Sequence, residues 1–146
     1  HFQVALKLYG RKALYQMLAF DAFIGNEDRH ENNFDLIIRD NGTNTPSIKP
    51  TPLYDNGAVY LRGNGRRTDR HQLRYQFDKA KPFRSRHAQQ IKLVDESVLP
   101  VRDLDELYQE ILQAISPILA LLSEKRASAI RQYLKYRLHY LKSAMG

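Results

Sequence analysis

The chain has 146 residues, of which 42% are hydrophobic and 27% are charged. This balance excludes wholesale disorder and fits one domain that is large enough to bury a core. The absence of cysteine excludes a disulfide scaffold and thiolate metal sites, and it is compatible with a reducing cytoplasm. No apolar run approaches the roughly 20 residues that a membrane-spanning helix needs, so we expect no membrane span.

The net charge of +7 is concentrated in one stretch. Residues 62–86 contain nine basic and two acidic side chains, which accounts for the whole excess. Two interpretations stay open: a solvated loop without a partner, or a surface for phosphate, an acidic protein or nucleic acid. The stretch includes Gly63 and Gly65 but lacks the Gly-Lys-Ser/Thr ending of a phosphate-binding P-loop. We expect it to be mobile without an anionic partner.

Residues 2–24 carry apolar side chains at three- and four-residue spacings, which predicts helix. Gly10 interrupts the pattern and separates either two helices or a loop from a helix. The better helix runs from about Arg11 to Phe23 and ends at Gly25, a residue suited to helix termination. Its aromatic side chains are expected in the core: Tyr15, Phe20 and Phe23.

A hairpin is predicted next. Phe34–Ile38 is short, apolar and rich in isoleucine, as strands are, and Asn41-Gly42 is a strong turn signal. Residues 42–52 have the composition of an exposed loop. We expect Leu53-Tyr54 to return as a short strand beside the first, which would bring Asp55 close to Asn33.

The last third of the chain is predicted to be helical. One apolar stripe lies on residues 104–115, and the acidic residues 103–106 suit its first turn. Ser116-Pro117 is expected to break that helix or to start another. Apolar residues from Ile130 to Leu141 predict a final helix. Its tyrosines are expected to pack, and its basic residues to supply polar faces: Arg131, Lys135, Arg137 and Lys142.

Two polar clusters stand beside apolar runs. The first is residues 25–33, Gly-Asn-Glu-Asp-Arg-His-Glu-Asn-Asn, and the second is residues 55–57, Asp-Asn-Gly. A carboxylate, an amide five residues later and a carboxylate on a neighbouring turn can hold a divalent cation. Mg²⁺ prefers such oxygen ligands and keeps several waters. The spare carboxylate can then orient a hydroxyl nucleophile, which is the division of labour in phosphoryl transfer.

The two clusters together resemble the catalytic core of HipA-like serine/threonine kinases, in which a Gly-Asn-x-Asp-x-His-x-x-Asn loop precedes a metal-binding Asp. They are also similar to the Asp-Arg-His-x-x-Asn loop and later Asp-x-Gly of phosphatidylinositol 3- and 4-kinases. The resemblance implies that Asp28 is the catalytic base. It also implies that Asn33 and Asp55 bind Mg²⁺ and, through it, ATP.

The implied fold is the C-terminal lobe of a protein-kinase-like fold, mainly α with a small β-hairpin at the active site. It spans residues 1–146, with the catalytic loop at 25–33, the metal motif at 55–57, an activation-type segment at 62–86 and a helical remainder at 87–146. The implied partners are a protein substrate, acidic or phosphorylated, and an antitoxin-type protein. The implied location is the cytoplasm.

Three residues near Asp28 keep more than one interpretation. His30 is a candidate catalytic residue that orients Asp28 or contacts a phosphate, or it is a structural donor under the loop. Arg29 pairs either with a phosphorylated residue of the activation-type segment or with a carboxylate. Asn32 replaces Asn33 if the loop register differs. A zinc site is not expected, because the five histidines are scattered.

The resemblance also implies an N-terminal lobe whose lysine contacts the nucleotide phosphates. Residues 1–27 are predicted to be helical and leave no room for it before Asp28. We therefore expect this chain to correspond to the C-terminal lobe alone and to be inactive by itself. Two other functions stay open: a phosphoinositide kinase lobe, in which the basic stretch grips lipid headgroups, and a non-enzymatic, basic nucleic-acid-binding module of a toxin–antitoxin system.

Overall fold

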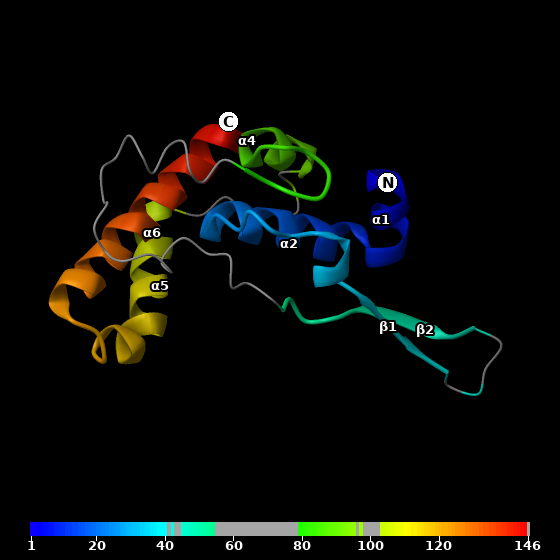
Figure 1. The fold of residues 1–146 in the computed structure, drawn as a ribbon, viewed down its shortest axis with the longest axis horizontal. Helices are drawn as coiled ribbons and strands as arrows, with labels where there is room; N and C mark the ends of the chain where they lie inside the picture. The colour runs from blue at the N-terminus through cyan, green and yellow to red at the C-terminus, as the bar shows by residue number, and fades with distance from the viewer. Residues whose placement is uncertain (41, 43–44, 55–78, 96, 98–102, 146) are drawn as a thin grey trace.

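In the computed structural model, the residues described are 1–40, 42, 45–54, 79–95, 97 and 103–145. Their architecture is mainly helical with one two-stranded antiparallel sheet (Figure 1). This confirms the predicted class of a helical chain with a small hairpin, while membership of a kinase lobe stays a prediction. None of the described helices combines the length and the apolar character that crossing a membrane requires.

Two helices open the chain. Helix α1 spans Phe2–Tyr9 and α2 spans Arg11–Ile24, and between them Gly10 adopts a φ of 83°, which favours glycine. The first of the two alternatives for Gly10, a boundary between helices, is therefore confirmed. Of the expected core aromatics, Tyr15 is buried, whereas Phe20 is 39% exposed. The helical period explains this error, because Phe20 lies off the face of α2 that carries the buried residues.

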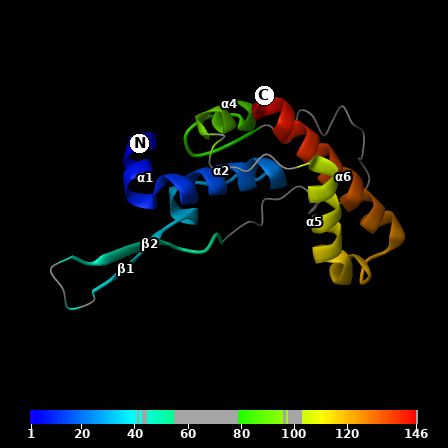
Figure 2. The ribbon, with the colours of Figure 1, turned by 180° about the vertical axis from the view of Figure 1, so that it is seen from behind.

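The hairpin differs from its prediction in its second strand. Strand β1 spans Leu36–Arg39 and pairs with β2, Ser47–Pro50, in a register that opposes Arg39 to Ser47 and Leu36 to Pro50. The expected strand at Leu53-Tyr54 is wrong. A hairpin pairs the residues nearest its turn first, so the return strand falls in the stretch expected to be a loop. The hairpin projects away from the helices in both views (Figures 1 and 2).

Helix α5 spans Leu104–Leu119. The carboxylate of Asp103 caps it, accepting hydrogen bonds from the backbone N–H groups of Asp105 at 2.8 Å and Glu106 at 3.1 Å. The helix continues through Pro117, so the predicted break at Ser116-Pro117 is wrong. Proline removes one helical N–H donor. The Ser116 hydroxyl compensates by donating to the Gln113 carbonyl, four residues before the proline, at 2.8 Å.

Helix α6, Glu124–Met145, packs on both α5 and α2. Tyr133 and Arg137 are buried and reach the end of α2. The Tyr133 hydroxyl donates to the Ile24 carbonyl at 2.7 Å, and Arg137 donates to the carbonyls of Phe23 at 3.2 Å and Ala22. These contacts satisfy carbonyls that a helix end leaves without partners. Arg137 was expected on a polar face. That expectation is wrong, because its guanidinium caps a neighbouring helix.

Two short elements, α4 (His87–Gln90) and the 3₁₀ helix η3 (Ile91–Leu93), complete the core. A buried hydrophobic cluster joins α1 and α2 to this segment through Tyr9, Leu14, Tyr15, Met17, Leu18, Ala22, Ile91 and Val94. The described end of the basic stretch, 79–86, forms a loop closed by a bridge between Lys79 and Arg86. The expected mobility of the whole stretch stays a prediction. Residues 62–78 lie outside the described part.

Candidate functional site

The polar loop starts with a turn at the end of α2. Gly25 ends the helix in the left-handed conformation, with a φ of 67°, which glycine adopts without strain. The Asp21 carbonyl accepts hydrogen bonds from the N–H groups of Gly25 and, at 2.9 Å, Asn26. The turn brings the Asn26 side chain back to the Asp21 carboxylate, where its amide nitrogen donates at 3.1 Å.

A buried ion pair lies beneath this loop. The Arg29 guanidinium donates from Nε to Asp21 Oδ2 at 2.9 Å and from Nη2 to Asp21 Oδ1 at 2.8 Å, and both side chains are completely buried. This is a two-pronged arrangement that suits the planar guanidinium. Burial raises the pKa of Asp21, and the hydrogen bonds from Arg29 and Asn26 oppose that rise.

The same guanidinium joins two separate parts of the chain. Arg29 Nη1 donates to the backbone carbonyl of Asn33 at 2.9 Å and to that of Tyr54 at 2.8 Å. The first carbonyl belongs to η1, the 3₁₀ helix Glu31–Asn33, and the second to the segment that follows the hairpin. Arg29 therefore fixes the end of the polar loop next to the return of the chain.

Of the two interpretations of Arg29, the contact with a carboxylate is confirmed, and pairing with a phosphorylated residue of the activation-type segment stays a prediction. That carboxylate, Asp21, was missed in the sequence. Its signal was present, because Asp21 follows Leu14 and Leu18 at helical spacing and stands between apolar neighbours. A charged residue on the core face of a helix needs a partner, which should have directed attention to Arg29.

Asp28 has a fixed backbone and a solvent-facing side chain. Its N–H donates to Asn26 Oδ1 at 3.1 Å, and its carbonyl accepts from the Asn33 side-chain nitrogen at 2.8 Å. The carboxylate is 47% exposed. Asn33 is buried, whereas Asn32 is exposed, and which of the two would bind a metal stays a prediction. The Asn33 nitrogen is used within the loop, which directs its amide oxygen elsewhere.

Two basic side chains flank the Asp28 carboxylate. Lys81 Nζ lies 2.8 Å from Oδ1, and His30 Nε2 lies 3.9 Å from Oδ2. The hydrogen bond from Lys81 lowers the pKa of Asp28, so the carboxylate is ionised at neutral pH. His30 Nδ1 accepts from the Asn32 N–H at 3.3 Å, so in neutral His30 the ring proton is on Nε2 and faces Asp28. Lys81 was not a candidate in the sequence analysis, because 53 residues separate it from Asp28.

Tyr54 brings the chain back to this loop. Its hydroxyl lies 2.6 Å from Asp35 Oδ2 and 2.9 Å from the Asn32 carbonyl, and both oxygens act as acceptors. Donation to Asp35 raises the pKa of Tyr54. The prediction that the chain returns toward Asn33 is confirmed as far as Tyr54, although not through a strand. The candidate metal ligand Asp55 and the rest of its motif lie outside the described residues.

The site has the beginnings of an oxygen donor set for a cation. In the described ranges, no three His, Cys, Asp or Glu side chains gather as a metal-binding group. The Asn33 amide oxygen is of the ligand type that Mg²⁺ takes. Its expected partner Asp55 lies outside the described residues, so the metal-binding pair stays a prediction.

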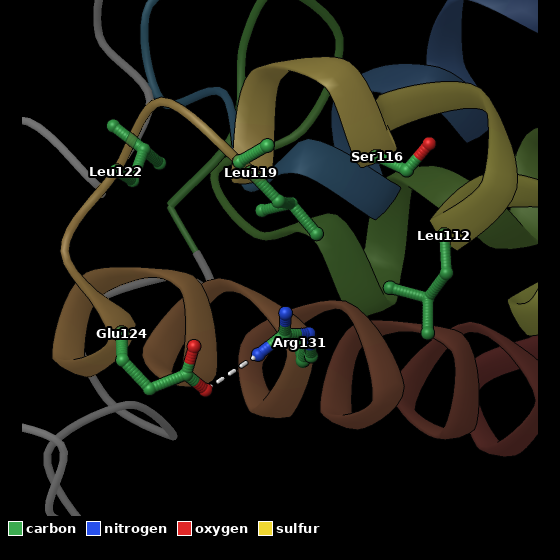
Figure 3. Close-up of a pocket in the computed structure, with 7 residues that line it drawn as sticks. Leu112, Ser116, Leu119, Leu122, Glu124 and Arg131 are labelled. Atoms are coloured by element: carbon green, nitrogen blue, oxygen red, sulfur yellow. Dashed lines mark hydrogen bonds and ion pairs between the residues drawn. The ribbon is translucent and has the colours of Figure 1, made fainter.

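A separate hollow of about 340 Å³ lies between α5 and α6 (Figure 3). Its lining comes from those two helices and the turn between them: Leu112, Ser116, Leu119, Ala120, Leu122, Glu124 and Arg131. An ion pair of 3.0 Å joins Glu124 to Arg131 at its edge. None of the loop residues 25–33 contributes to its lining.

Comparison with protein-family models, with curated proteins and with solved structures found no match to this chain. The functional assignment therefore depends on the chemistry and geometry of the residues described above.

Proposed function

We propose that this chain is the catalytic lobe of a HipA-like kinase that transfers the γ-phosphoryl group of ATP to Ser or Thr of a protein. The observation that supports this most is the position of the buried Asp21–Arg29 ion pair beneath the polar loop. It holds Asn33 beside Tyr54, the residue that precedes Asp55. It does so while the adjacent Asp28 carboxylate stays accessible. A buried charge pair is costly to form, and this one is placed where it fixes a polar loop.

In this proposal Asp28 accepts the hydroxyl proton of the protein substrate. Asn33 and Asp55 would hold Mg²⁺, which when bound neutralises phosphate charge. His30, whose Nε2 lies 3.9 Å from Asp28 Oδ2, would orient the carboxylate. The fixed backbone of Asp28 supports the role, because phosphoryl transfer depends on positioned groups more than on covalent chemistry.

The remaining parts of a kinase are assigned to partners. An N-terminal lobe, in the same protein or on a separate chain, would cover the nucleotide and supply the phosphate-contacting lysine. The basic stretch 62–86 would meet an acidic or phosphorylated protein substrate. An antitoxin-type protein is a further proposed partner, as is a cytoplasmic location.

The test is phosphate transfer by the full-length protein. It is incubated with Mg-ATP and either a mixture of acceptor proteins or phosphoinositide vesicles, with Asp28→Asn as the variant and Glu31→Gln as the matched control in the same loop. Loss of a general base lowers transfer by about 100- to 10,000-fold. We expect that loss in Asp28→Asn, wild-type rates in Glu31→Gln, and similar thermal stability in all three.

The outcomes separate the candidates. Label on protein that depends on Asp28 supports the proposal, whereas label on lipid alone assigns the site to a phosphoinositide kinase. Equal rates in wild type and Asp28→Asn would refute Asp28 as the base.

A further inference from the structure

Lys81 makes a contact with the candidate site that the proposed function does not use. Its ammonium group lies 2.8 Å from Asp28 Oδ1, although 53 residues separate the two in sequence. Both side chains are about half exposed, 53% for Lys81 and 47% for Asp28. Ion pairs as exposed as this one contribute little to folding stability, because water screens them. Stability is therefore a weak explanation for placing a lysine at this carboxylate.

The loop that carries Lys81 is held by a buried side chain. Gln90, on α4, is 1% exposed. Its amide oxygen accepts from the backbone N–H groups of Phe83 at 3.0 Å and Arg84 at 3.1 Å, and its nitrogen donates to the Lys81 carbonyl at 2.8 Å. The backbone of Lys81 is thus fixed, while four side-chain carbons leave its ammonium group free to move by a few ångströms.

We propose that Lys81 is a catalytic residue whose ammonium group contacts the γ-phosphoryl oxygens of bound ATP. This inference rests on the proposed function. An acceptor oxygen in position to attack lies about 3–3.5 Å from the phosphorus, so the phosphoryl oxygens come close to any cation beside Asp28. A lysine ammonium is a compact charge with three donors. It can move from the Asp28 carboxylate oxygen to a phosphoryl oxygen and donate a hydrogen bond there.

The step balances as follows. The acceptor oxygen forms a bond to the γ-phosphorus, the bond from that phosphorus to the β–γ bridging oxygen breaks, and the hydroxyl proton passes to the Asp28 carboxylate. The products are the phosphorylated protein and ADP, and protonated Asp28 returns its proton to solvent. Lys81 takes up no proton. Its charge offsets the negative charge on the transferring oxygens.

Nucleotide affinity tests the contact separately from turnover. We would measure the dissociation constants of Mg-ATP and Mg-ADP for the full-length protein by calorimetry, with Lys81→Met as the variant. Lys79→Met is the matched control, since Lys79 is an exposed lysine on the same loop. A hydrogen bond to a charged group changes affinity by about 10- to 100-fold. We expect that weakening for Mg-ATP with Lys81→Met, unchanged Mg-ADP binding, partial recovery in Lys81→Arg, and wild-type affinities in the control.

Each other outcome overturns something definite. Equal weakening of both nucleotides, or of neither, would exclude a contact with the γ-phosphoryl group while leaving the proposed function in place. Tighter Mg-ATP binding or faster transfer in Lys81→Met would show that the pair with Asp28 is an inhibitory latch. Failure of the wild-type protein to bind either nucleotide would overturn the proposed function together with this inference.

Discussion

Breaking the buried pair between Asp21 and Arg29 tests the central structural argument. Both side chains are completely inaccessible, and the Arg29 guanidinium donates to Asp21 as well as to the backbone carbonyls of Asn33 and Tyr54. Arg29→Met removes the donors and leaves a buried carboxylate with the Asn26 amide. Asp21→Asn keeps the shape of the side chain and leaves a buried guanidinium without its counter-charge.

Removing one member of a buried pair costs about 3–5 kcal/mol, because the charge that stays is buried and loses the opposite charge of the pair. We expect each single variant to lower the free energy of unfolding by that amount. A chain of this size has about 5–15 kcal/mol in total, so both variants are close to the limit of folding. The double variant buries neither charge, and its loss should be smaller than the sum of the single losses by at least about 1 kcal/mol.

Urea unfolding followed by circular dichroism measures these losses, with Arg131→Met as the control. Arg131 makes a surface ion pair with Glu124, with side chains 39% and 83% exposed, so the same substitution there should cost less than about 1 kcal/mol. If Arg29→Met does not fold at 25 °C, Arg29→Lys and Asp21→Asn form the series. Two outcomes would refute the view that this pair fixes the loop. In one, the two single losses sum to the loss of the double variant within about 0.5 kcal/mol; in the other, each single loss is no larger than that of Arg131→Met.

The pH dependence has a definite sign. Burial raises the pKa of Asp21, and loss of the Arg29 cation in Arg29→Met removes the main opposing influence. A carboxyl whose folded-state pKa is above its unfolded value destabilises the fold when it is ionised. The deficit of Arg29→Met relative to wild type should therefore shrink as the pH falls through the folded-state pKa of Asp21 toward its unfolded value of about 4.

Two further predictions concern residues outside the pair. Gln90→Ala should lower the free energy of unfolding by about 1–3 kcal/mol, because it leaves three backbone groups of the Lys81 loop without their hydrogen-bond partner. It should also weaken Mg-ATP binding as Lys81→Met does. Normal Mg-ATP affinity in Gln90→Ala would show that the loop does not need this support. Hydrogen bonds from the first turn of α5 lower the pKa of Asp103 in the folded state. The stabilisation of the fold by the Asp103 carboxylate is therefore complete above its unfolded-state pKa of about 4, and it is lost as the pH falls through its folded-state pKa. Thermal melts should show this loss in wild type and not in Asp103→Asn, which caps without a charge; identical pH profiles would contradict the capping role.

Local signals predicted much of the fold. Helical spacing and glycine placement located α1 and α2, and acidic residues marked the start of α5. Errors arose where the deciding contact is non-local or depends on a single side chain. The hydroxyl of Ser116 lets α5 pass through Pro117, and Arg137 is buried because it caps α2, a helix more than 100 residues earlier. Neither effect appears in hydrophobic periodicity.

The candidate site shows the same division. The resemblance of residues 25–33 led us to propose Asp28 and Asn33, and the structure joins these two residues by a hydrogen bond within one local loop. The residues that surround them come from elsewhere: Asp21 from the core face of α2, and Lys81 from a loop that only the packed chain brings near. Periodicity could have exposed Asp21 as a charge on an apolar face, whereas Lys81 had no sequence signal.

The hydrogen bonds from α6 to the end of α2 also affect when the polar loop 25–33 can form. Contacts from Tyr133 to Ile24 and from Arg137 to Phe23 span 109 and 114 residues. Bringing residues so far apart in sequence together lowers the chain entropy before the contacts between them form. Contacts between distant residues therefore slow folding. During synthesis, the carbonyls of Phe23 and Ile24 stay without these partners until α6 has left the ribosome. The end of α2, which positions residues 25–33, is therefore completed by residues made more than 100 positions later.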